Sequence, residues 1–162
     1  MPSWSRDGRW IYFCSNRSGS LQVWKMPSEG GPARQLTKQG GFEGFEEASG
    51  EFFYYAKGRG VPGIWKLPVE GGEETPVAEA DIAGPRRNWA LGDKGIYFTN
   101  NEQPEKPVIA FFSFATGKVT RLATLDRPMN SQGIALSPEG RWLLFSLTDR
   151  QRQNIMLVEN VR

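Results

Sequence analysis

Seven arginines in predicted loops are the residues of this chain best suited to hold a ligand. The planar guanidinium group can donate two parallel hydrogen bonds to one carboxylate or phosphate, so arginines gathered on one surface favour anion binding. The chemistry that they predict is recognition of an anionic group, with no covalent change in it. The seven are Arg17, Arg59, Arg86, Arg87, Arg127, Arg150 and Arg152.

Three acidic residues, Asp7, Asp93 and Glu139, have the type needed for acid and base catalysis. Each precedes an apolar run at the same place in its own repeat, so the three are expected to lie far apart. A carboxylate in such a turn accepts hydrogen bonds from nearby backbone amides. We therefore interpret them as turn residues, and we predict no catalytic residues.

The composition excludes several classes of site. The chain has no histidine and a single cysteine, Cys14, so His-based triads, the common zinc clusters and an intrachain disulfide cannot form. Cys14 lies in an apolar run and is predicted to be a core residue. We predict no cofactor and no metal.

The charge balance bears on the partners. Lysine and arginine number 20 against 18 acidic residues, and a net charge of +2 is too small to drive binding to a phosphate backbone. Nucleic acid is not expected as a partner of this segment. No apolar stretch approaches the roughly 20 residues that span a bilayer, so membrane insertion is not expected either. Extracytoplasmic and cytoplasmic locations both remain open.

The loops belong to an internal repeat with a period of roughly 40 to 45 residues. In the first repeat the turn Arg6–Gly8 precedes the apolar run Trp10–Phe13. In the fourth repeat Pro138–Gly140 precedes Trp142–Phe145. Looser copies lie between them. We predict four repeats, over residues 1–41, 42–80, 81–127 and 128–162.

Each unit is predicted to form four short antiparallel strands, the last unit lacking its outer one. The second strand is almost continuously apolar, which indicates that both of its faces are covered, as in stacked blades. The first two units share the strings Trp24–Pro27 and Trp65–Pro68, whose tryptophans are predicted to lie in the core. The fold class is all-β: a β-propeller built of four four-stranded antiparallel blades.

The repeat resembles that of the TolB-type, WD-repeat-like β-propellers. Their blade consensus is an apolar or aromatic residue, then Ser-Pro-Asp-Gly-Lys/Arg and an aromatic strand, and Trp4–Arg9 and Leu136–Arg141 match it best. Similar repeats form the propeller of dipeptidyl-peptidase-IV-type serine peptidases and follow winged-helix domains in some bacterial regulators. The lack of histidine excludes the Asp-His-Ser-Trp network of true WD repeats.

The resemblance implies that the chain is the C-terminal part of a larger propeller. Closed propellers have about four to eight blades, and a chain that starts at a first strand and stops without its last one fits a fragment. In isolation the segment is expected to close tightly or to form a homo-oligomer through open blade faces.

In a propeller, the loops between the second and third strands share one face with the connections between blades. That face would carry the seven arginines together with Lys38 and Lys57. The opposite face would carry Asp7, Glu29, Glu70, Glu73, Asp93 and Glu139. This asymmetry favours an anionic partner on the basic face. Ordinary solvated charge is the alternative, because the basic loops also contain Glu43, Glu79, Asp81, Glu102 and Glu105.

The function predicted from these observations is a non-catalytic binding or scaffold module. It would present its loops to a protein, a peptide or a small acidic ligand, within a larger regulatory or sensor protein. The alternative is the substrate-gating propeller of a serine peptidase whose catalytic domain is absent, although nothing here resembles the Gly-x-Ser-x-Gly motif. A periplasmic TolB-like adaptor is a third interpretation, which an upstream signal peptide would support.

Overall fold

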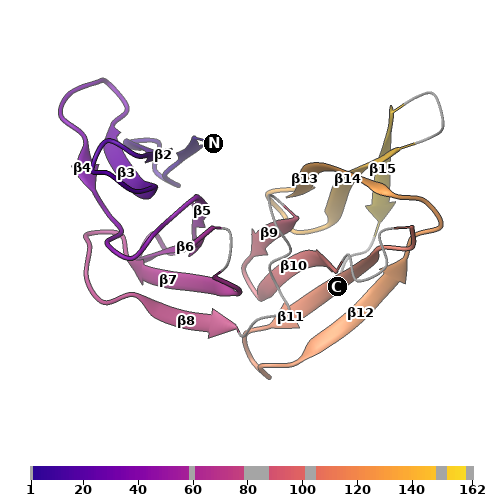
Figure 1. The fold of residues 1–162 in the computed structure, drawn as a ribbon. Coiled ribbons are helices and arrows are strands. Elements are labelled where there is room, and N and C mark those ends of the chain that lie inside the picture. Colours follow the sequence, from indigo (N-terminus) through magenta and orange to yellow (C-terminus); the bar gives the residue numbers. More distant parts are fainter. Residues whose placement is uncertain (1, 59–60, 79–87, 101–104, 149–152, 160–162) are drawn as a thin grey trace. The chain divides into compact units, whose positions relative to one another are not determined.

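The computed structural model describes residues 2–58, 61–78, 88–100, 105–148 and 153–159. Within these ranges the regular secondary structure consists of β-strands. The strands form four antiparallel sheets in chain order (Figure 1). The predicted all-β class and the blade-like sheets are confirmed. The chain divides into two units, residues 1–80 and 81–162, with two sheets in each.

The first unit holds two four-stranded sheets, each with its strands paired in sequence order. The first sheet contains β1 (Ser3–Trp4), β2 (Trp10–Ser15), β3 (Gln22–Pro27) and β4 (Arg34–Gln35). The second sheet contains β5 (Glu43–Glu46), β6 (Phe52–Ala56), β7 (Ile64–Pro68) and β8 (Thr75–Ala78).

The second unit holds a four-stranded third sheet and a three-stranded fourth sheet. The third sheet contains β9 (Trp89–Gly92), β10 (Gly95–Asn100), β11 (Val108–Ser113) and β12 (Val119–Thr124). The fourth contains β13 (Met129–Leu136), β14 (Trp142–Thr148) and β15 (Gln153–Glu159). Among the described residues, no helix has the length and apolarity needed to cross a lipid bilayer.

The turn between β1 and β2 shows why the repeat has an acidic residue followed by glycine. Asp7 Oδ1 accepts hydrogen bonds from the Arg9 amide at 2.9 Å and from the Ser5 hydroxyl at 2.7 Å, and these bonds lower the pKa of Asp7 to about 2. Gly8 follows at φ 73°, a conformation that favours glycine. The predicted turn role of Asp7 is confirmed.

The turn between β13 and β14 has the same backbone pattern. Ser137 Oγ accepts the Trp142 amide at 3.0 Å, as Ser5 Oγ accepts the Trp10 amide at 2.8 Å, and Gly140 has φ 69°. The similarity of the first and fourth repeats in sequence therefore extends to their hydrogen bonds.

Strand β4 contains only Arg34 and Gln35. The amides of Leu36 and Thr37 both donate to the Val23 carbonyl, at 2.8 and 3.3 Å, while Thr37 Oγ1 accepts the Val23 amide at 2.9 Å. A side chain thus replaces the backbone partner that a longer strand would supply, and the strand ends at Gln35.

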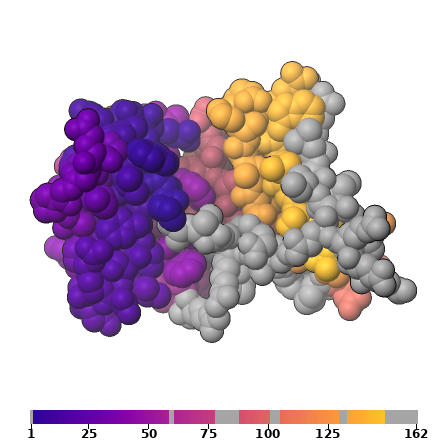
Figure 2. Space-filling model, turned by 90° about the horizontal axis from the view of Figure 1, so that it is seen from above, coloured from indigo at the N-terminus to yellow at the C-terminus, as the bar shows by residue number. Residues whose placement is uncertain are grey.

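In each unit, two sheets share one apolar core. In the first unit, the first sheet and the segment after β4 contribute Tyr12, Val23 and Leu36 to the core. The second sheet contributes Phe53, Tyr55 and Leu67. The rings of Tyr12 and Phe53 stack with their centroids 4.4 Å apart. Residues of the first sheet form the packed indigo surface in Figure 2. Cys14, predicted to lie in the core, is half-buried, and burial raises the pKa of its thiol.

The second unit is built in the same way. Its core contains Ala90, Tyr97 and Ile109 from the third sheet and Ile134, Leu143, Phe145 and Leu147 from the fourth. Alternate residues of β14 enter this core, whereas Leu144 between them is 40% exposed. The period of two therefore places the core side chains of β14 on the face toward the third sheet.

Candidate functional site

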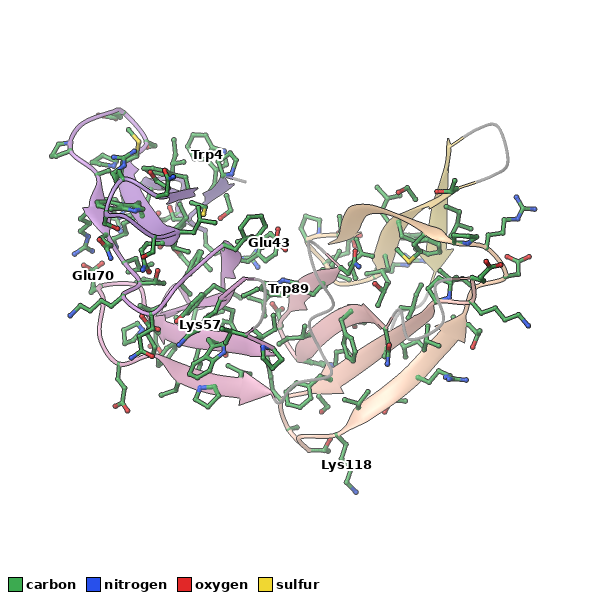
Figure 3. All side chains as sticks on the ribbon, viewed as in Figure 1. Trp4, Glu43, Lys57, Glu70, Trp89 and Lys118 are labelled. Atoms are coloured by element: carbon green, nitrogen blue, oxygen red, sulfur yellow. The ribbon has the colours of Figure 1, made fainter. Side chains whose placement is uncertain are left out.

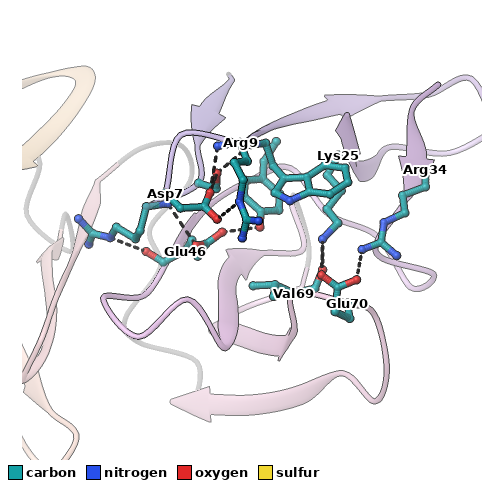
Figure 4. Close-up of polar contacts among 11 residues, drawn as sticks. Asp7, Arg9, Lys25, Arg34, Glu46, Val69 and Glu70 are labelled. Carbon is teal, nitrogen blue, oxygen red and sulfur yellow. Dashed lines mark hydrogen bonds and ion pairs between the residues drawn. The ribbon is translucent and has the colours of Figure 1, made fainter. Parts of the chain in front are cut away.

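The charged groups of the first unit include three contacts that join its two sheets, and an exposed arginine, Arg17, that lies on aromatic rings. The first structural contact joins the first two sheets at Glu46 on β5. Its carboxylate accepts hydrogen bonds from the Arg6 amide at 3.1 Å and from the Tyr12 hydroxyl at 2.5 Å, while Arg6 Nε donates to the Glu46 carbonyl at 3.2 Å (Figure 4). Burial and this carboxylate raise the pKa of Tyr12, so its hydroxyl remains a donor.

A second contact is made by Lys25, whose side chain is 1% exposed. Its ammonium group donates to the Val69 carbonyl at 2.6 Å and to Glu70 Oε1 at 3.0 Å, and it lies 4.5 Å from the centre of the Trp10 ring (Figure 4). Burial lowers the pKa of Lys25, although the Glu70 carboxylate opposes that effect. Arg34 also pairs with Glu70, so both cations serve the interface between the sheets.

A third contact is the buried ion pair between Lys57 and Glu74. Their charged groups lie 3.0 Å apart, and the side chains are 4% and 6% exposed. Lys57 Nζ also lies 3.5 Å from the centre of the Trp65 ring, and Glu74 Oε1 accepts the backbone amides of Lys38 and Gln39. The sequence placed Lys57 among the solvent-facing loop cations, but in the structure its charge is neutralised inside the protein.

Arg17 is an exposed cation in the loop between β2 and β3. Its guanidinium carbon lies 5.1 Å from the centre of the Phe13 ring and 5.0 Å from that of the Trp24 ring. Its Nε donates to Ser15 Oγ at 3.0 Å. Among the described residues, no carboxylate pairs with Arg17 and its two terminal nitrogens have no hydrogen-bond partner.

Stacking gives Arg17 a fixed orientation on the protein surface. The two rings and Ser15 restrain the guanidinium plane, so its free edge is ready to pair with a carboxylate or a phosphate. Trp24, predicted to be a core residue, is half-buried, and the Arg17 guanidinium group lies over its ring. The sequence indicates Arg17 as a candidate binding residue. Its contacts with the Phe13 and Trp24 rings could not be predicted, because they depend on the path of the loop.

The other predicted site residues fall in two groups. Arg127 is exposed between β12 and β13, in the second unit. Five of the predicted residues lie outside the described ranges, so the predicted cluster is represented in the structure by Arg17 and Arg127. These five are Arg59, Arg86, Arg87, Arg150 and Arg152.

Comparison with known sequences identifies no family. No family model matches the chain. A stretch of 36 residues is 44% identical to part of an uncharacterized protein from Agrobacterium fabrum, and it covers 22% of this chain and 12% of that protein.

Solved structures share the fold over nearly the whole chain. TolB from Acinetobacter baumannii has a TM-score of 0.78 at 18% identity, and the match covers 98% of this chain and 40% of that one. A putative TolB from Agrobacterium tumefaciens has a TM-score of 0.74 at 18% identity, with 98% and 57% covered. A puromycin-hydrolyzing peptidase from Mycobacterium tuberculosis has a TM-score of 0.71 at 13% identity, with 99% and 28% covered.

These likenesses and the four antiparallel sheets assign the chain a β-propeller fold. The fold is of the TolB type, as the turn and strand pattern of the repeats predicted. The chain spans 40% and 57% of the two TolB chains, so it corresponds to part of those structures.

Proposed function

We propose that this chain is a non-catalytic recognition module that binds an anionic group on a protein, a peptide or a small ligand. The observation that carries the proposal is the state of Arg17, which is exposed and held on two aromatic rings with its terminal nitrogens unpaired among the described residues. By contrast, Lys25, Arg34 and Lys57 are each paired with a carboxylate, and Arg6 donates to a carbonyl.

The binding mechanism is presentation of a preoriented group by a rigid sheet. An arginine that is already held loses less conformational entropy when it pairs with a ligand, so more of the interaction energy appears as affinity.

The proposal predicts a specific loss of affinity when Arg17 is changed. Arg17→Gln should weaken binding of an amidated tetraglutamate peptide about tenfold or more, because a hydrogen bond to a charged group contributes about 1.5–3 kcal/mol. Isothermal titration calorimetry at low ionic strength measures this affinity, and added salt should reduce the difference.

Lys118→Gln is the matched control. It removes one exposed positive charge from the second unit and should leave the affinity for tetraglutamate within about twofold of the original. Equal losses in the two variants would show that only net charge matters, and the proposal would then be wrong. A neutral tetraglutamine peptide should not distinguish the variants.

A second function is favoured by one comparison. The fold is shared with a puromycin-hydrolyzing peptidase over 99% of this chain, which supports a propeller that controls access of substrate to a hydrolase. The reading frame around this segment distinguishes the two functions. A downstream hydrolase domain with a Gly-x-Ser-x-Gly motif would support the peptidase, and an upstream winged helix would support a regulator.

A further inference from the structure

The third sheet buries two polar side chains next to each other. Asn88 is 4% exposed and directly precedes β9, whose first residue, Trp89, is labelled in Figure 3. Thr99 lies on β10 and is fully buried. The Thr99 amide donates to the Asn88 carbonyl at 2.8 Å, which continues the pairing of β9 with β10 by one residue. Asn88 and Thr99 are therefore directly opposite each other.

Both side chains lie on the face of the third sheet that packs against the fourth. Opposite residues of an antiparallel pair share a face, and alternate residues of each strand return to it. Ala90 and Tyr97, two positions from Asn88 and Thr99, are opposite each other and belong to the core of the second unit. Ile109, opposite Thr99 on β11, belongs to the same core. A polar pair thus lies beside apolar core residues.

This pair has two oxygen atoms that need a hydrogen-bond partner. Asn88 Oδ1 and Thr99 Oγ1 are buried, and neither has a partner among the described residues, so the two side chains do not bond to each other. A buried polar group without a hydrogen bond is destabilising, and ordered water commonly supplies the bond in native proteins. Opposite β-carbons of antiparallel strands lie about 4.5–5.5 Å apart, close enough for one water molecule to contact both side chains.

The corresponding position in the first sheet has a partner from the protein itself. Strands β2 and β10 share the string Ile-Tyr-Phe, which is followed by Cys14 in β2 and by Thr99 in β10. Cys14 Sγ donates to the Gly41 carbonyl at 3.4 Å. The Thr99 hydroxyl has no such carbonyl among the described residues. The third sheet therefore needs a ligand where the first sheet uses its own backbone.

We propose that Asn88 and Thr99 bind one buried water molecule. The Thr99 hydroxyl donates to the water oxygen, and the water donates to Asn88 Oδ1, so both side chains gain a hydrogen bond. Neither side chain is charged, which favours a neutral ligand in a buried site. The water would hold Asn88, which directly follows the predicted binding residues Arg86 and Arg87 in the chain. The site does not involve Arg17, so it stands apart from the proposed function.

The first test detects the water by NMR in the full 162-residue chain. Threonine is labelled with carbon-13, and the methyl signals of Thr99 and Thr120 are assigned with the Thr99→Val and Thr120→Val variants. A water that stays bound gives NOE and ROE signals of opposite sign at the Thr99 methyl group. Thr120, exposed on β12 of the same sheet, is the control and should not show this pair of signals.

The second test uses stability, measured by urea unfolding. With water bound, Thr99→Val removes a partner of the water and should lower the folded-to-unfolded ratio about tenfold, because Asn88 Oδ1 is left without a satisfied bond. Without water, valine would replace a hydroxyl that was already unpaired, and the ratio should rise. The double variant Asn88→Leu, Thr99→Val removes both polar groups and should be more stable than Thr99→Val. Thr120→Val should change the ratio by about twofold at most.

Three outcomes would overturn the water site. NOE and ROE signals of the same sign at Thr99, or none at all, would show that no water stays bound, and this test does not depend on any variant being folded. A Thr99→Val protein more stable than the original would mean that the hydroxyl has no partner to lose. A stability that falls when choline replaces sodium at constant ionic strength, and that Thr99→Val makes independent of sodium, would identify a cation as the ligand.

Discussion

Glu74→Gln is expected to lower the free energy of unfolding by about 3–5 kcal/mol, which is the usual cost of removing one partner from a buried ion pair. The Lys57 side chain is 4% exposed. Without the Glu74 carboxylate, the Trp65 ring and the Gln39 amide oxygen would remain beside its buried ammonium group. An uncompensated buried charge is the reason for the size of the effect. Urea unfolding followed by tryptophan fluorescence measures it.

Two further variants test the cause. Glu73→Gln, at the exposed neighbouring residue, should change the stability by less than about 0.5 kcal/mol. The double variant Lys57→Met, Glu74→Gln removes the buried charge as well and should be more stable than Glu74→Gln alone. A double variant that is less stable than the single one would show that Lys57 acts by packing and not by its charge.

Lowering the pH should reduce the difference in unfolding free energy between the original protein and the Glu74→Gln variant. Burial raises the pKa of the Glu74 carboxyl, but hydrogen bonds from the Lys38 and Gln39 amides and the nearby Lys57 ammonium group outweigh that effect and bring the pKa below its ordinary value of 4.5. A carboxyl with a lowered pKa stabilises the fold above its unfolded pKa and loses that contribution as the pH falls through the folded pKa. The two unfolding curves should therefore converge below about pH 4.5, and a constant separation down to about pH 3 would contradict this account.

Phe53→Ala is expected to cost about 3–5 kcal/mol of unfolding free energy. The ring is 1% exposed, stacks on Tyr12 at 4.4 Å and lies 6.4 Å from the ring of Tyr55. Its loss would open a cavity between the first and second sheets, in addition to removing the aromatic stacking. Chemical denaturation again gives the value.

The neighbouring strand offers a control for the position of the ring. Phe45 on β5 is 38% exposed, so Phe45→Ala should cost clearly less than Phe53→Ala. Phe53→Leu should fall between the two, because leucine keeps part of the buried volume. Equal costs for Phe45→Ala and Phe53→Ala would mean that the core does not lie where the two sheets meet.

Much of the fold could be predicted because it depends on local, repeated signals. The serine and glycine around the turns at Asp7 and Glu139 act within five residues of each other, so they can be recognised in one sequence. The end of β4 could not be predicted, since it depends on Thr37 bonding to the backbone of Val23, a residue 14 positions away.

The candidate site was predictable only in part. A loop arginine at position 17 is visible in the sequence, but its contact with Phe13 and Trp24 depends on how the loop folds back on the sheet. The same limit explains Lys57. Its partner Glu74 lies on the far side of a strand and a hairpin, and no sequence spacing distinguishes a lysine that enters such a pair from one that stays in solvent.

At the interface between the first two sheets, the second repeat supplies carboxylates that accept hydrogen bonds from the first. Glu46, Glu70 and Glu74 all belong to the later repeat, and each accepts a hydrogen bond from a group in the earlier one. A gene rearrangement that placed two copies of the first repeat in tandem would bring those donors against Trp4, Glu29 and Ala33, and two of the three acceptors would be missing. The first repeat therefore depends on the second for these acceptors, and the second repeat cannot be exchanged for a copy of the first without loss of polar contacts.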